Sequence, residues 1–288
     1  MAVYTDFSDE EFAAFMAGYD LGPVLAVKGI AEGVENSNYL LSTASGQFIL
    51  TLYEKRVAAG DLPFFLTLME HLAARGVSCP TPLKTKDGVS LRSLRGRPAA
   101  MVTFLEGLWP RRIGVPHCLQ LGKALASLHR AGADFPMRRV NDLSVAGWGT
   151  LLDATRAQAD GVKAGLAAAL DAEYRELAER WPSGLPTGVI HADLFPDNVF
   201  FLGDTLSGLI DFYFACTDAL AYDLAVCLNA WCFEADRSLN VTKARALVQG
   251  YETVRPLEPA ERAALPLFAR GSALRFHQGV ADGAAYGL

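Results

Sequence analysis

Hydrophobic positions in the N-terminal third of the chain fall into short runs that are typical of β-strands. Apolar, β-branched and aromatic residues cluster between polar breaks, and four such segments predict strands: residues 24–30, 38–42, 47–53 and 98–104. Residues 61–75 instead predict a helix, with Asp61 as its N-cap and Gly76 at its end. This order favours an antiparallel sheet with one packed helix.

Polar residues predict two smaller features in the same region. Ser8 and Glu11 have the spacing of a capping box, in which each side chain bonds the other residue's backbone N–H, so a short N-terminal helix is expected. Residues 86–88, Lys-Asp-Gly, are typical of a hairpin turn between Leu83 and Leu91.

After a connector at residues 105–107, the pattern becomes helical. Apolar residues recur at helical spacing in five segments that predict helices: residues 116–130, 151–180, 222–233, 243–251 and 259–276. Two apolar runs, residues 199–202 and 206–210, predict one hairpin. The sequence therefore predicts an α+β protein with two lobes: a β-rich N-terminal lobe over residues 1–104, with one main helix, and a mainly α-helical lobe over residues 105–288.

Charge and composition exclude several classes of protein. The 288 residues include 26 Lys and Arg against 32 Asp and Glu, a net charge of −6, which leaves no basic footprint for nucleic acid or an anionic membrane. A hydrophobic content of 51% excludes a mainly disordered chain. The cysteines show no CxxC spacing, and the low-charge stretch 206–233 contains three Asp residues. Reduced thiols, no membrane span and a cytoplasmic location are therefore predicted.

The clearest chemical signal is the segment 191–198, His-Ala-Asp-Leu-Phe-Pro-Asp-Asn, followed 13 residues later by Asp211 at the end of an apolar run. Phosphoryl transfer from ATP needs positioned Mg²⁺ and a carboxylate that receives the proton of the nucleophile. Asp193 suits the second task, while the amide oxygen of Asn198 and the carboxylate of Asp211 are hard ligands for Mg²⁺. Each piece alone is also typical of a turn or a helix cap, but the two in this order match the signature of a kinase.

Six segments spread over the chain carry a family resemblance: residues 36–39, 48–55, 62–65, 69–72, 122–129 and 191–198. They resemble the aminoglycoside phosphotransferase and choline kinase-like branch of the protein kinase-like fold, and within it they are similar to the bacterial homoserine kinases. The resemblance implies a two-lobed kinase with ATP in the cleft. It also implies ATP and Mg²⁺ as cofactors and transfer of the γ-phosphate to the side-chain hydroxyl of L-homoserine, a step of threonine biosynthesis.

The resemblance also implies roles for individual residues. Asp193 matches the catalytic aspartate, His191 the residue that supports the catalytic loop, and Asn198 and Asp211 the Mg²⁺ ligands. The positions of the family's phosphate loop and adenine hinge fall on six residues: Gly33, Ser37, Asn38, Met101, Phe104 and Glu106.

The third strand departs from the family's pattern. Thr51 stands where kinase-like proteins carry a Lys or Arg that grips the ATP phosphates, and Lys28 and Lys55 are the candidates to supply that charge instead. Glu70 is either the helical partner of such a lysine or a solvated residue. Asp223 is either a helix N-cap or a brace for the catalytic loop.

Three functions follow, of which the first is the favoured prediction. The first is an ATP-dependent kinase of L-homoserine, which acts by direct in-line transfer. The second is a kinase of the same fold for another hydroxyl acceptor, such as an aminoglycoside or a choline-like compound. The third is a catalytically silent nucleotide-binding module. Small molecules are the predicted partners, with neither nucleic acid nor membrane, and the sequence leaves monomer and homodimer equally open.

Overall fold

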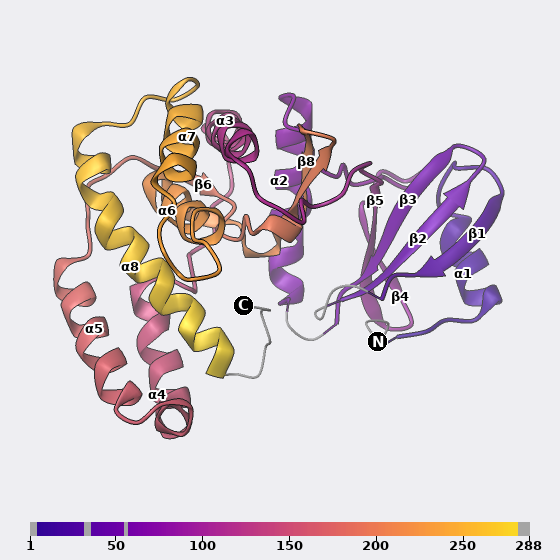
Figure 1. Ribbon diagram of the computed structural model, residues 1–288. Helices are drawn as coiled ribbons and strands as arrows, with labels where there is room; N and C mark the ends of the chain where they lie inside the picture. Colours follow the sequence, from indigo (N-terminus) through magenta and orange to yellow (C-terminus); the bar gives the residue numbers. More distant parts are fainter. Residues whose placement is uncertain (1–4, 32–35, 55–56, 282–288) are drawn as a thin grey trace. The chain divides into compact units, whose positions relative to one another are not determined.

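The computed structural model describes the backbone of residues 5–31, 36–54 and 57–281, and side chains up to residue 275. Contacts divide the chain into two units (Figure 1). The first comprises Met1–Leu108, Phe200–Leu202 and Ser207–Tyr213, and the second comprises Trp109–Val199, Gly203–Leu206 and Phe214–Leu288. The predicted hairpin is present as β7 (Val199–Leu202) and β8 (Thr205–Leu209), and its residues are shared between the two units.

A five-stranded antiparallel sheet forms the body of the N-terminal unit. Its strands are β1 (Val24–Gly29), β2 (Ser37–Thr43), β3 (Gly46–Leu52), β4 (Leu91–Leu94) and β5 (Arg97–Thr103), in the spatial order β1-β2-β3-β5-β4. Because side chains alternate between the two faces of a strand, β2 buries every second residue, from Ser37 through Leu41 to Thr43. The predicted strands are therefore confirmed, and β4 is an addition to them.

Helix α1 (Asp9–Met16) packs its phenylalanines against this sheet. Ser8 Oγ accepts the Glu11 N–H at 3.2 Å, and Glu11 Oε2 accepts the Ser8 N–H at 2.9 Å, so the predicted capping box is confirmed. Phe12 and Phe15 then join one buried cluster with the sheet residues Leu41 and Leu50. Burial of this apolar face gives the short helix its stability, since a helix of this length is marginal alone.

Helix α2 (Leu62–Ala74) follows a short 3₁₀ turn, Ala59–Asp61. Asp61 occupies the N-cap position as predicted, and its side chain makes no capping hydrogen bond. Residues 86–87 form a turn as predicted, yet they do not join paired strands. Strand β4 pairs instead with β5, through a turn in which Arg95 and Gly96 both have positive φ (56° and 71°).

The C-terminal unit is built from six helices among the described residues, with one small sheet. The helices are α3 (Val115–Ala131), α4 (Val145–Val162), α5 (Leu166–Arg180), α6 (Leu220–Trp231), α7 (Val241–Glu252) and α8 (Pro259–Ala281). Strands β6 (Thr187–Ile190) and β9 (Cys216–Ala219) pair antiparallel. The predicted single helix over residues 151–180 is broken between α4 and α5, where Gly165 adopts φ 79°. This left-handed conformation suits glycine and ends a regular helix.

Helices α3 and α7 lie side by side with their backbones in close contact (Figure 1). A Cβ atom on Gly122 of α3 would lie 2.0 Å from the Leu247 carbonyl oxygen, and one on Gly250 of α7 would lie 2.1 Å from the Leu119 carbonyl oxygen. Glycine is required at both positions, because any side chain would force the two helices apart.

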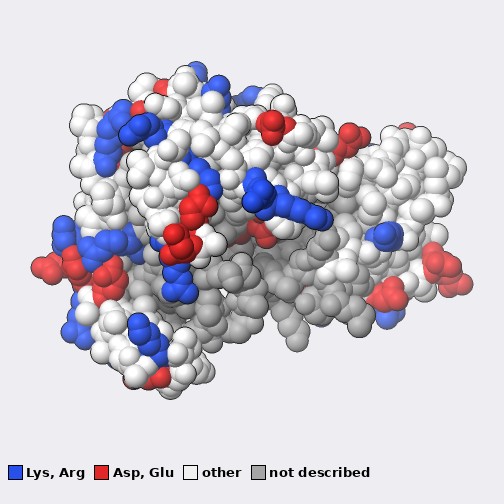
Figure 2. Space-filling model, in the orientation of Figure 1, with Lys and Arg blue, Asp and Glu red and all other residues white. Residues whose placement is uncertain are grey.

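Surface charges are arranged in mixed pairs where α4, α5 and α8 lie, and Figure 2 shows blue and red side chains next to one another there. Arg270 contacts Glu173 and Glu176 at 2.7 Å each, and Arg156 contacts Asp171 at 2.7 Å. Within the part of the chain that the structure describes, no helix combines the length and the apolar character needed to cross a lipid bilayer.

Candidate active site

The segment from His191 to Asn198 forms a tight loop directly after strand β6. The strand ends at Ile190, so His191 is the first residue beyond it, and a 3₁₀ turn over Pro196–Asn198 leads the chain into β7. The apolar residues Val189 and Ile190, which precede the loop in the sequence, are buried, and so is Val199, which follows it. Strands therefore anchor both ends of this polar segment.

Asp193 and Asn198, predicted from the sequence to act together, are in direct contact. The Asn198 side-chain nitrogen donates to the Asp193 backbone carbonyl at 2.8 Å and to Asp193 Oδ2 at 3.1 Å. Both residues are buried, with 5% and 9% of their surface exposed. Because the amide nitrogen is committed to Asp193, the Asn198 Oδ1 atom is the end of the side chain that can ligate a cation.

Asp223 holds the backbone at the start of this loop. Its carboxylate accepts the His191 N–H at 2.7 Å and the Ala192 N–H at 2.9 Å, and His129 Nε2 lies 3.1 Å from it. Burial opposes ionisation of Asp223, but the hydrogen bonds from His129 and His191 hold its pKa below the ordinary value. The N-cap of α6 is Ala219, so Asp223 is no cap, and its contacts fit the predicted brace.

A chain of buried and half-buried side chains continues from Asp223 away from the loop. A carboxylate only accepts hydrogen bonds, so His129 donates from Nε2, and its Nδ1 lies 2.8 Å from Tyr251 Oη. Arg255 donates to Tyr251 Oη at 3.1 Å and pairs with Glu261 at 3.0 Å. This relay links α3, α6, α7 and α8, and sequence analysis did not reveal it.

Two further side chains contact the loop from helices distant in sequence. Trp231 Nε1 donates to the Leu194 carbonyl at 2.7 Å. Arg275 donates to the Ala192 carbonyl and lies 3.3 Å from Asp193 Oδ1. Arg275 was not predicted, although its spacing of seven residues from the buried Phe268 places it on the inner face of α8. The sequence contains the signal for its burial but not for its partner.

Asp211 belongs to the N-terminal unit, two residues after β8. Its φ is 63°, a left-handed conformation that aspartate tolerates better than most residues. Within this unit Tyr53 Oη lies 3.0 Å from Tyr213 Oη. Burial, together with the charge of Asp211, raises the pKa of Tyr213 to about 12. Burial and the nearby charge of Asp211 raise the pKa of Tyr53 as well, so both phenols stay neutral.

Two of the predicted phosphate-loop residues, Ser37 and Asn38, lie on β2 and are hydrogen bonded to β3 and its end. Ser37 Oγ donates to Glu54 Oε1 at 2.8 Å, and Asn38 Oδ1 accepts the Thr51 hydroxyl at 2.8 Å. Thr51 therefore holds the Asn38 side chain in place, and it does not supply the positive charge that a Lys or Arg has at this position in kinase-like proteins. Gly33 and Lys55 lie outside the described residues.

Of the predicted hinge residues, Met101 lies within β5, and Phe104 and Glu106 follow its end. Met101 is fully buried, and its carbonyl accepts the Leu83 N–H at 2.8 Å. The Phe104 N–H donates to the Gln47 carbonyl at 3.3 Å, while Glu106 is exposed. Contact of these three residues with adenine stays a prediction.

Two charged residues of the N-terminal unit remain from the predicted nucleotide site, Glu70 and Lys28, and the structure describes both. Glu70 pairs with Lys84 at 2.9 Å and accepts the Ser90 hydroxyl at 3.0 Å. Lys28 is exposed on β1, where it pairs in register with Leu40. The structure therefore gives Glu70 a lysine partner that the sequence prediction did not name.

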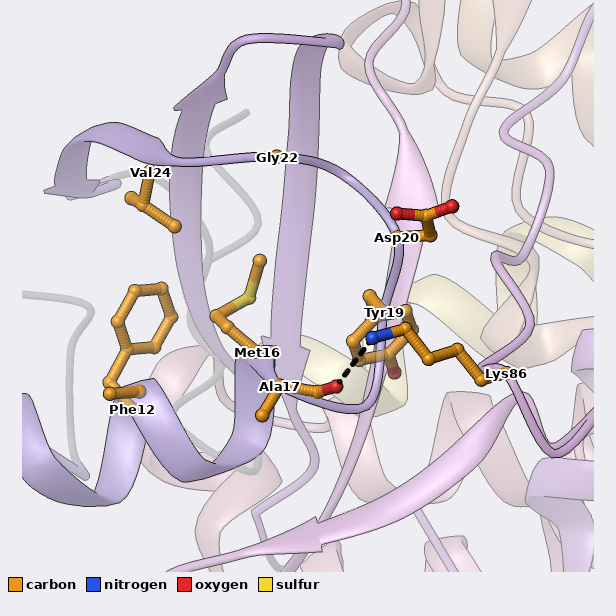
Figure 3. A pocket seen from close by; sticks show the side chains of 9 residues that line it. Phe12, Met16, Ala17, Tyr19, Asp20, Gly22, Val24 and Lys86 are labelled. Carbon is orange, nitrogen blue, oxygen red and sulfur yellow. Dashed lines mark hydrogen bonds between the residues drawn. The ribbon is translucent and has the colours of Figure 1, made fainter.

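A cavity of about 510 Å³ in the N-terminal unit contains none of the predicted site residues (Figure 3). Phe12, Met16, Tyr19 and Val24 line it, and Lys86 Nζ at its rim donates to the Ala17 carbonyl at 3.2 Å. Lys86 thus caps the C-terminal end of α1, which is a structural role.

The two predicted Mg²⁺ ligands belong to different units, Asn198 to the C-terminal one and Asp211 to the N-terminal one. Each carries a side-chain oxygen of the kind that fits Mg²⁺, which typically takes one or two protein oxygens and completes its shell with phosphate and water. Binding of one ion by both residues stays a prediction. No group of three or more His, Cys, Asp or Glu side chains that would hold a metal ion occurs within residues 5–31, 36–54 and 57–275.

Comparison with known proteins gives one matching family model, described as the phosphotransferase enzyme family, over residues 26–257. The homoserine kinase of Afipia carboxidovorans is 64% identical over 276 residues, which cover 96% of this chain and 85% of that protein. The homoserine kinase of Parvibaculum lavamentivorans is also 64% identical, over 96% of this chain and 86% of that protein. The resemblance found in the sequence is confirmed.

Solved structures with low sequence identity share the fold. An amicoumacin kinase, hAmiN, in complex with AMP-PNP, Ca²⁺ and Ami, aligns with a TM-score of 0.73 at 14% identity, over 96% of this chain and 87% of that one. The choline kinase of Cryptosporidium parvum Iowa II aligns with a TM-score of 0.71 at 14% identity, over 96% of this chain and 90% of that one. The predicted α+β, protein kinase-like fold is therefore confirmed.

Proposed function

Because this chain belongs to the phosphotransferase enzyme family, we propose that it transfers the γ-phosphoryl group of ATP to the side-chain hydroxyl of L-homoserine. The choice of acceptor rests on the homoserine kinases that are 64% identical over nearly the whole chain. The choice of chemistry rests on one observation, the contact of Asp193 with Asn198 on a buried loop.

Asp193 orients the acceptor and receives its proton. Both carboxylate oxygens already have a donor nearby, Arg275 at Oδ1 and Asn198 at Oδ2. These donors stabilise the carboxylate form, so Asp193 is a weak base that accepts a hydrogen bond from the acceptor hydroxyl. Such a base suffices, because the transition state of phosphoryl transfer is loose and the hydroxyl loses its proton late.

Asn198 and Asp211 are the residues that would hold Mg²⁺. When bound, the ion neutralises charge on the ATP phosphates. The hydrogen bonds from Asn198 to Asp193 keep the amide oxygen in one orientation, which prepares it as a ligand. His191 supports the loop through its backbone bond to Asp223.

Nucleotide binding is proposed for residues 1–104 and catalysis with acceptor binding for residues 105–288. Gly33, Ser37, Asn38, Met101, Phe104 and Glu106 are the proposed ATP contacts. Lys28 and Lys55 are the basic candidates for the phosphates. A cytoplasmic location and the choice between monomer and homodimer stay predictions.

A coupled assay of ADP release tests the function directly. Purified protein with ATP and Mg²⁺ is given L-homoserine, choline, an aminoglycoside or no acceptor, and only L-homoserine is expected to raise the rate strongly. Asp193→Asn is expected to lower kcat by about 10²–10⁴-fold, the usual contribution of a general base. The control is Asp197→Asn, which removes an exposed carboxylate from the same loop.

Two results would contradict the proposal. One is an ADP-release rate that L-homoserine does not change. The other is equal activity of the Asp193→Asn and Asp197→Asn variants, which would show that the reaction does not depend on the Asp193–Asn198 pair.

A further inference from the structure

We propose that Arg275 of helix α8 is a positioning residue for the catalytic aspartate, an inference that rests on the proposed kinase function. Its guanidinium group donates to the Ala192 carbonyl and lies 3.3 Å from Asp193 Oδ1. Arg275 and Asp193 are both buried, with 5% of each residue exposed. A buried charge is retained only where its partners compensate the loss of water, and here those partners are two consecutive residues of the catalytic loop.

The backbone between these contacts is strained. Ala192 has φ 62°, a left-handed conformation that is unfavourable for a residue with a Cβ atom. The Ala192 N–H is held by Asp223 at 2.9 Å, and its carbonyl is held by Arg275. Both peptide groups that flank the strained residue are therefore fixed, one from α6 and the other from α8. This conformation sets the direction in which the next residue, Asp193, leaves the loop.

The surroundings of Arg275 hold its guanidinium group in one place. The group lies over the ring of Phe214, with 5.6 Å between its central carbon and the ring centroid. A charged arginine also lies close enough to Tyr222 to offset part of the effect of burial on that phenol, whose pKa is raised to about 12. The planar, rigid fork of arginine can bond the carbonyl and the carboxylate together, which a lysine ammonium does less well.

The test compares variants of two arginines on the same helix. Arg275→Met removes the fork, and Arg270→Met removes an arginine of surface ion pairs with Glu173 and Glu176. In the homoserine assay, Arg275→Met is expected to lower kcat by about 10²-fold, the cost of misplacing a catalytic group by about 1 Å. The KM for ATP stays near the wild-type value, and Arg270→Met keeps the wild-type kcat.

Two readouts separate positioning from general stability. Methylguanidinium added to Arg275→Ala restores part of the lost kcat in a saturable manner, whereas it does not change Arg270→Ala. Hydrogen exchange of the amides of residues 191–194 becomes faster in Arg275→Met than in Arg270→Met, and this readout needs neither acceptor nor nucleotide. If Arg275→Met fails to fold, Arg275→Lys is used, with a kcat below that of Arg270→Lys expected.

The inference is overturned if the variants at position 275 match those at position 270 in kcat and in exchange of residues 191–194. It is also overturned if methylguanidinium restores no activity to Arg275→Ala. Failure of the proposed function has a different signature, namely wild-type protein that does not respond to L-homoserine, while the exchange experiment still reports on Arg275.

Discussion

The Asp223 carboxylate accepts the backbone N–H of Ala192 at 2.9 Å, although the two residues are 31 positions apart in the sequence. The same carboxylate accepts the His191 N–H and contacts His129, so it satisfies three buried donors at once. A single side chain of α6 thus fixes the entry to the candidate catalytic loop and joins it to α3.

Replacement of this carboxylate is expected to destabilise the whole C-terminal unit. Asp223→Ala leaves two backbone N–H groups and one imidazole N–H buried without an acceptor, which should lower the free energy of unfolding by about 3–5 kcal/mol. Equilibrium unfolding in urea at neutral pH measures this change. Asp236→Ala, which removes an exposed carboxylate, should change the free energy by less than about 0.5 kcal/mol. A similar small change for Asp223→Ala would contradict the interpretation.

Stability at acid pH should depend on Glu176. The hydrogen bond from Arg270, with one from Arg180, lowers the pKa of Glu176 to about 2. Since the pKa in the unfolded chain is about 4.3, the stabilising contribution is complete above that pH and is lost as the pH falls toward 2. The melting temperature of Glu176→Gln should therefore lie below that of the wild type near pH 7, and the difference should shrink near pH 3.

The matched control on the same helix is Glu179→Gln, whose carboxylate is exposed. Its melting temperature should follow that of the wild type throughout. If the melting-temperature difference between Glu176→Gln and the wild type grew as the pH fell, the pH dependence would have the wrong sign. The lowered pKa of Glu176 would then be refuted as the source of stability.

The contact of Trp231 with the loop predicts a combined loss of stability and activity. Trp231→Phe keeps most of the buried ring but leaves the Leu194 carbonyl without its 2.7 Å donor. The expected cost is about 1–3 kcal/mol, measured by urea unfolding, with a lower kcat because Leu194 adjoins Asp193. Trp109→Phe is the control, since Trp109 is 50% exposed. If both variants had the same kcat and the same free energy of unfolding, the hydrogen bond of Trp231 would contribute to neither.

The close approach of α3 and α7 predicts that Gly122 tolerates no side chain. Gly122→Ala places a Cβ atom against backbone of α7, which cannot move without shifting the whole helix, and overpacking of this kind costs about 1–3 kcal/mol. Gly161→Ala is the control within α4, because a Cβ atom there meets nothing within 4 Å. Alanine at that position should be neutral or stabilise the helix by up to about 1 kcal/mol. The melting temperature of Gly122→Ala should therefore fall, whereas that of Gly161→Ala should stay unchanged or rise.

Features set by neighbouring residues could be predicted from the sequence. The capping box of Ser8 and Glu11 and the hairpin at residues 199–209 depend on local spacing, and both are present. The contact of Asp193 with Asn198 follows in the same way, because both residues lie on one short loop. The resemblance to a family supplied the fold, since periodicity alone does not fix how helices pack.

Features that depend on distant partners could not be predicted in this way. The sequence places Glu70 on a helix but does not identify the residue that it pairs with. Only the structure shows that this partner is Lys84, at 2.9 Å. The break after Val162 depends on a glycine whose left-handed conformation is one of several that glycine adopts freely. The pairing of Arg275 with Asp193 spans 82 positions, and no local pattern encodes it.

The relay from Asp223 through His129, Tyr251 and Arg255 to Glu261 connects the candidate catalytic loop with the corner between α7 and α8. Each donor in it depends on the next, and the last members sit at the end of α7 and the start of α8. Local opening at this corner would therefore remove partners from Tyr251 and His129, and through them from the carboxylate that holds the His191 and Ala192 amides.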